Sequence, residues 1–92
     1  MYDELYVAWR LEIENGDLGS LPSDFYARTT DYLRRIKEES KMLDKKNVRA
    51  NLLEKEMANA RRIVEELISA RYRKLIKMVM AGRKVPSDSL TA

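Results

Sequence analysis

The 92-residue sequence contains no cysteine and no histidine. Without cysteine there can be no disulfides and no thiolate metal sites, and without histidine the commonest metal ligand and general base is missing. Glycine and proline are scarce, at 3 and 2 residues. These absences remove much enzyme chemistry, so we expect a protein that is not an enzyme and that holds no cofactor and no metal.

Long apolar runs are also lacking. No run approaches the roughly 20 residues of a membrane span, and the acidic start Met-Tyr-Asp-Glu is unlike a secretory signal. We therefore expect an intracellular protein with no membrane partner. Hydrophobic residues make up 45% of the chain and charged residues 36%, which is typical of one soluble helical domain with a small core.

Apolar residues recurring every three or four positions predict three helical segments, over residues 2–15, 23–44 and 47–82. The expected fold is an all-α bundle of three or more helices. The third segment has no internal glycine or proline and is much the longest.

The ends of these segments carry residue types typical of caps. Asp3 and Ser23 are predicted N-caps, and Gly16 stands where the glycine that follows a helix is expected.

The length of the third segment predicts an overhang. A helix of that length spans about 50 Å, whereas a compact chain of this size is roughly 30 Å across. Because apolar residues continue along it, the overhanging part should be covered by a second chain or another partner. The alternative is a bend or break near Asn59 or Ser69 that folds the helix back on the domain.

One apolar stripe of the third segment is, taken as a whole, the predicted subunit interface, whereas each member taken singly is assigned first to the chain's own core. Its residues are Leu53, Met57, Ala60, Val64, Leu67 and Ile68. Another set of large side chains is predicted to anchor the helices to one another. These structural anchors are Trp9, Leu21, Phe25, Tyr26 and Tyr32.

Basic residues dominate the end of the chain, where no acid occurs between Glu66 and Asp88. They either complement the helix dipole or contact an acidic protein surface or nucleic acid. The candidate contacts are Arg71, Arg73, Lys74, Lys77, Arg83 and Lys84. Arg71 lies at the edge of the apolar stripe, where an arginine should reach a carboxylate.

Several motifs, in their order along the chain, are similar to the helical domain of the GINS family of DNA replication factors. Most distinctive is the stretch Leu21-Pro22-x-Asp24-Phe25-Tyr26 at the start of the second segment. The others are Asp3-Glu4-Leu5, Gly16-Asp17-Leu18, Tyr32-Leu33, Glu56, Asn59 and Glu66-Leu67-Ile68-x-x-Arg71-x-x-Lys74-Leu75. The resemblance covers about residues 3–80.

This resemblance implies a non-catalytic scaffold of the replicative helicase. The expected partners are other GINS subunits, in a homo- or hetero-oligomer, together with the minichromosome-maintenance helicase and a RecJ-like cofactor, with nucleic acid bound weakly or indirectly. The helical-first order resembles the archaeal-type class, so the compartment would be an archaeal cytoplasm or a eukaryotic nucleus. Residues 1–82 would form the helical domain and 83–92 a linker-like tail, without the family's small β-rich domain.

Two other functions are alternatives to this one. A generic helical module for protein or nucleic-acid interaction is the main alternative. A chorismate mutase is a weaker alternative, because Leu67-Ile68-Ser69-Ala70-Arg71 resembles a motif which that family carries in its first helix, whereas residues 2–15 contain only Arg10.

Overall fold

The computed structural model describes residues 1–82 and contains three helices in that range, with no strand. They are α1 (Tyr2–Glu14), α2 (Phe25–Met42) and α3 (Val48–Met80). The predicted all-α fold with a long third helix is confirmed. Each helix begins and ends within about two residues of its predicted bounds.

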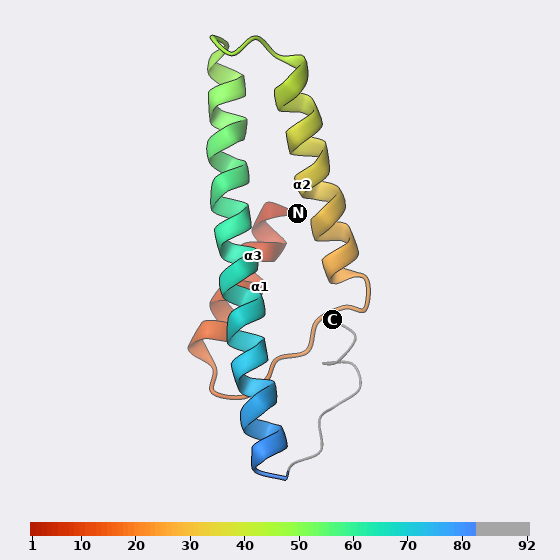
Figure 1. Ribbon diagram of the computed structural model, residues 1–92, viewed down its shortest axis with the longest axis vertical. Coiled ribbons are helices and arrows are strands. Elements are labelled where there is room, and N and C mark those ends of the chain that lie inside the picture. Colours follow the sequence, from red (N-terminus) through yellow and green to blue (C-terminus); the bar gives the residue numbers. More distant parts are fainter. Residues whose placement is uncertain (83–92) are drawn as a thin grey trace.

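The three helices form an elongated molecule of 54 × 21 × 18 Å. α2 and α3 form an antiparallel hairpin, and the shorter α1 lies behind the middle part of α3 (Figure 1). Both α1 and α2 pack mainly on α3. α3 runs through its 33 residues without the break considered near Asn59 or Ser69, so it spans about 50 Å and nearly the whole long axis.

The hydrophobic core lies where all three helices meet. Leu5 of α1, Phe25 of α2, and Ala60, Ile63 and Leu67 of α3 make up the buried cluster. Of the predicted structural anchors, Phe25 belongs to this cluster. The others pack against it and are Trp9, Leu21, Tyr26 and Tyr32.

The predicted caps of the first two helices are wrong. α1 begins after Met1, so Asp3 lies inside its first turn, where a carboxylate complements the helix dipole. The N-cap of α2 is Asp24 rather than Ser23, and it makes no side-chain capping bond. Its carboxylate instead pairs with the Arg28 guanidinium at 3.1 Å, because that side chain lies one turn further along the helix.

α1 also ends without the predicted left-handed glycine. Its C-cap is Asn15 in an extended conformation, and both the backbone N–H and the side-chain amide of Asn15 donate to the Leu11 carbonyl. Gly82 is the only glycine of the described residues with a positive φ, at 72°, and it follows the C-cap of α3. The expected glycine geometry therefore occurs at the end of α3 instead.

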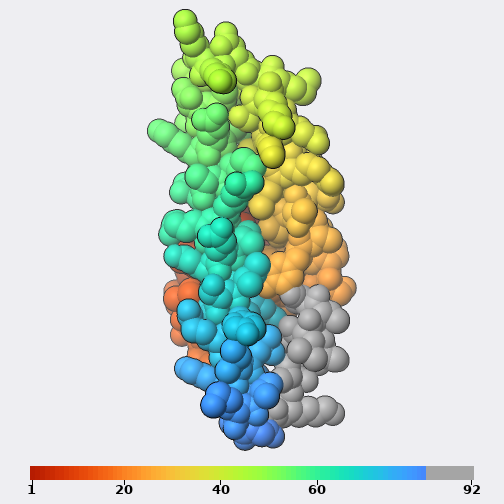
Figure 2. All heavy atoms as spheres, viewed as in Figure 1, coloured from red at the N-terminus to blue at the C-terminus, as the bar shows by residue number. Residues whose placement is uncertain are grey.

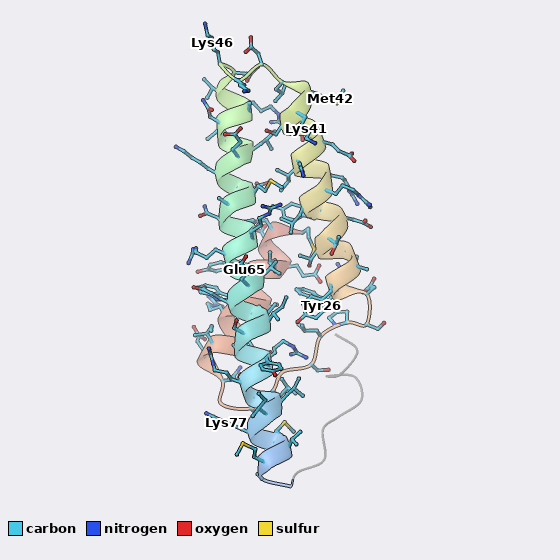
Figure 3. All side chains as sticks on the ribbon, viewed as in Figure 1. Tyr26, Lys41, Met42, Lys46, Glu65 and Lys77 are labelled. Carbon is cyan, nitrogen blue, oxygen red and sulfur yellow. The ribbon has the colours of Figure 1, made fainter. Side chains whose placement is uncertain are left out.

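The turn between α2 and α3 is held by polar contacts. The side chain of Asn47 caps α3 by accepting a hydrogen bond from the Arg49 N–H at 2.8 Å, and Asp44 accepts one from the Lys46 N–H at 3.1 Å. Arg49 also reaches back to Glu39 of α2 at 2.6 Å. Lys46 projects from this end of the molecule (Figure 3).

Candidate functional site

A buried carboxylate joins α1 to the C-terminal half of α3. Only 4% of the Glu12 residue surface and 3% of the Arg71 surface are exposed to solvent. The Arg71 guanidinium donates to Glu12 Oε1 at 2.8 Å and also to the Gly19 carbonyl at 2.6 Å. The expectation that Arg71 reaches a carboxylate is confirmed, and its partner is Glu12.

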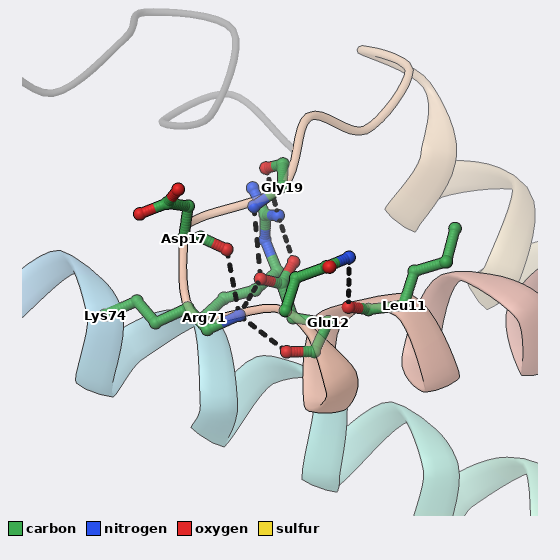
Figure 4. A network of polar contacts seen from close by, with 7 residues as sticks. Leu11, Glu12, Asp17, Gly19, Arg71 and Lys74 are labelled. Carbon is green, nitrogen blue, oxygen red and sulfur yellow. Dashed lines mark hydrogen bonds and ion pairs between the residues drawn. The ribbon is translucent and has the colours of Figure 1, made fainter.

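Lys74 binds the same carboxylate from the next turn of α3 (Figure 4). Its ammonium group donates to Glu12 Oε2 at 2.6 Å, to the Glu12 carbonyl at 2.5 Å and to the Asp17 carbonyl at 3.0 Å. An ammonium group has three donors, and all three are used here. Lys74 therefore fastens the α1–α2 loop to α3.

The glycine-rich loop is shaped by this cluster. The Gly19 N–H donates to Glu12 Oε2 at 3.1 Å, while its carbonyl accepts from Arg71. A Cβ at position 19 would lie 3.1 Å from Glu12 Oε1. Glycine allows the loop backbone to approach the carboxylate closely enough for these bonds.

Two opposing effects act on the Glu12 carboxyl. Burial alone would raise its pKa, but hydrogen bonds from Lys74, from the Gly19 N–H and from Arg71 together outweigh burial. The net result is a pKa below the ordinary 4.5, so Glu12 is ionised at neutral pH. It carries the single negative charge between two cations.

These hydrogen bonds remove two residues from the predicted set of basic contacts with an external partner. Arg71 is buried and Lys74 has used its donors, so the prediction that they meet an external acidic or nucleic-acid partner is wrong for both. Arg73 and Lys77 are exposed. Arg83 and Lys84 lie outside the described residues.

The predicted subunit interface divides into two parts. Ala60 and Leu67 are fully buried in the chain's own core, so they have no surface to offer a second chain, and their assignment to the interface is corrected. Ile68 is 47% exposed. The remaining three, which are partly buried, are Leu53, Met57 and Val64.

Ile68 begins an exposed apolar strip that continues toward the end of α3. Tyr72 is 62% exposed, Ile76 41% and Val79 67%. Steps of three and four residues place these side chains on one face of the helix. We call Ile68, Tyr72, Ile76 and Val79 the C-terminal strip. In the space-filling view α3 lies open to solvent along its length on one face (Figure 2).

Sequence reasoning missed Glu12, although a signal for it exists. Leu5, Ala8 and Trp9 pack in or against the core, and Glu12 is the next residue at helical spacing on that face. A carboxylate that continues an apolar stripe must be paired once it is buried. The exposed end of the strip was missed because sequence does not show how far α2 covers α3.

The part of the chain that the structure describes meets neither the requirements of a metal site nor those of a membrane-spanning helix. Residues 1–82 hold no cluster of three or more acidic side chains suited to a metal ion. None of the described helices has both the length and the apolar character needed to cross a membrane. Comparison of the chain with protein-family models, curated proteins and solved structures finds no match.

Proposed function

We propose that this chain is a non-catalytic scaffold subunit of a GINS-type replication complex, which assembles through helix packing and bridges or activates the replicative helicase. The observation that carries the proposal is the C-terminal strip. Its apolar side chains lie on a helix that is too long for the domain around it, and each remains between 41% and 67% exposed.

The motif context also supports the proposal. Leu21-Pro22-x-Asp24-Phe25-Tyr26 opens α2, with Leu21 and Tyr26 against the core and Phe25 within it. Lys74, in the motif Glu66-Leu67-Ile68-x-x-Arg71-x-x-Lys74-Leu75, binds the loop that precedes this stretch. These motif residues therefore lie in the part of the fold where the loop and the start of α2 pack on the core.

The alternative is a generic helical interaction module that binds another protein or nucleic acid. Exposed Arg73 and Lys77 favour an anionic partner for such a module. The two proposals differ in partner, because only the first requires the helicase.

Reconstitution from purified components separates them. The chain is mixed with the minichromosome-maintenance helicase and the RecJ-like protein of the same organism, and co-elution is followed by size-exclusion chromatography. We expect a stable complex that a Tyr72→Lys, Val79→Lys double variant weakens. A chain that elutes alone at micromolar concentrations of all components would argue against the scaffold and for the generic module.

A further inference from the structure

A groove runs between the α1–α2 loop and the C-terminal half of α3, beside the Glu12 cluster. Its volume is about 630 Å³. Its lining combines apolar and charged side chains, and the charged ones other than Glu12 and Lys74 are called the rim. The lining side chains that matter here are Ile13, Leu18, Met78, Asp17, Arg73 and Lys77.

The charges around this groove do not balance. Glu12 provides one carboxylate for two cations, Arg71 and Lys74. The rim adds two further cations and only one further carboxylate, that of Asp17. Four cations against two carboxylates leave a net charge of +2 around the groove.

Only the two rim cations are available to a ligand, since Lys74 has no donor left. Arg73 and Lys77 make no ion pair with any residue of the range 1–82. They lie one helical turn apart, so they present charge along the same edge of the groove. Lys77 extends outward from α3 near its lower end (Figure 3).

We propose that this groove binds an acidic, amphipathic peptide segment of a partner protein. Carboxylates of the segment would pair with Arg73 and Lys77, while an apolar side chain would rest on Ile13, Leu18 and Met78. At about 630 Å³ the groove is much larger than one bound phosphate needs. Two free cations would also release few counterions from a DNA duplex, which disfavours nucleic acid as the occupant.

The groove is separate from the C-terminal strip. Tyr72 and Arg73 are neighbours in sequence, as are Ile76 and Lys77, and consecutive residues are turned by about 100° around a helix. A partner on the strip and a peptide in the groove would therefore occupy different faces. This inference does not rest on the proposed scaffold function, and its test does not use the helicase.

The test is an NMR titration of the isotope-labelled chain with three synthetic 14-residue peptides. All three carry leucines at the same helical spacing, and the positions between them hold glutamate, glutamine or lysine. We expect saturable amide shifts around Ile13, Leu18, Arg73, Lys77 and Met78 with the glutamate peptide. The glutamine peptide should bind at least about tenfold more weakly, because it lacks the charge.

Paired variants locate the site. Arg73→Glu with Lys77→Glu should weaken binding of the glutamate peptide at least about tenfold. Lys41→Glu with Lys45→Glu makes the same charge change at the opposite end of the molecule and should alter affinity less than about twofold. Circular dichroism spectra of both variants check that they remain folded.

Several outcomes would overturn the proposal. These are equal binding of the glutamate and glutamine peptides, no saturable shifts up to about 1 mM peptide, shifts outside the groove, or equal loss in both variant pairs. Groove shifts caused by a DNA duplex but by no peptide would assign the groove to nucleic acid instead.

Discussion

At the scale of single residues, Glu12 determines how α1 and the loop sit on α3. Its carboxylate takes bonds from Arg71, Lys74 and the Gly19 N–H, which come from two separate parts of the chain. A buried ion pair adds little net stability over an apolar replacement of the same shape. Its effect is to fix one arrangement, because any shift of the loop would leave a buried charge unpaired.

Removing that carboxylate should be costly. Glu12→Gln leaves Arg71 and Lys74 facing each other without a counter-charge, so we expect the free energy of unfolding to fall by about 3–5 kcal/mol. Urea unfolding followed by circular dichroism measures it. Glu14→Gln, on an exposed side chain of the same helix, should change it by less than about 0.5 kcal/mol. Similar values for the two variants would contradict the role given to Glu12.

The same carboxyl makes stability depend on pH. Because the folded-state pKa of Glu12 is below its ordinary 4.5, ionised Glu12 stabilises the fold above about pH 4.5. That contribution is lost as the pH falls through the folded-state pKa. Unfolding free energies measured between pH 2.5 and 6 should show a drop for the wild type that is smaller in Glu12→Gln. Parallel curves for the two proteins would rule out this linkage.

Removing the Tyr32 hydroxyl should affect stability in the opposite direction to removing the Glu12 carboxylate. The buried Tyr32 hydroxyl makes no hydrogen bond of good geometry with a described residue, and burial together with the nearby Glu56 carboxylate raises its pKa, while the ring packs against the core. Tyr32→Phe removes a polar group that burial penalises and keeps the ring, so we expect unchanged or higher stability, by up to about 1 kcal/mol. Thermal unfolding monitored by circular dichroism measures it. A loss above about 1 kcal/mol would mean that the hydroxyl is bonded in solution.

At the scale of elements, periodicity predicted the helices well and their caps poorly. The apolar spacing of α3 is set by local sequence, which is why its start near residue 47 and its continuity could be read. Caps depend on which competing partner a side chain meets. Asp24 binds Arg28 instead of the backbone, and Glu12 meets Arg71 across 59 residues of sequence. Such pairings appear only once the helices are placed.

Asn47 is the side chain that the structure shows capping α3. Its Oδ1 accepts the Arg49 N–H, so Asn47→Ala should lower the free energy of unfolding by about 1 kcal/mol. Asn51→Ala is the matched control, because Asn51 is exposed inside the same helix, where alanine is favoured. Denaturant unfolding of both variants measures the difference. Equal stability of the two variants would show that the cap contributes nothing.

At the scale of the whole molecule, the shape carries the functional argument. The radius of gyration is 15.8 Å, whereas a compact chain of this length has about 12 Å. The excess comes from α3, whose ends extend past the region where all three helices meet (Figure 1). The sequence predicted this overhang from helix length alone. It misplaced the exposed surface, because Ala60 and Leu67 proved to be core residues.

The C-terminal strip should make the chain associate with itself or with a related subunit. Light scattering coupled to size-exclusion chromatography, over a concentration series, should give a mass that rises above the 10.8 kDa of one chain. Tyr72→Lys with Val79→Lys should return the monomer mass. Both side chains are more than 60% exposed, so the folded chain should tolerate the change within about 0.5 kcal/mol each.

Met42→Lys is the control for that experiment, since Met42 is 87% exposed at the opposite end of the hairpin. It adds charge and removes an apolar side chain without touching the strip, so the mass should stay as in the wild type. If Met42→Lys lowered the mass as much as Tyr72→Lys with Val79→Lys, the cause would be general charge repulsion rather than loss of an interface at the C-terminal strip. A wild-type monomer at every concentration would exclude self-association through the strip and would favour a different subunit as its partner.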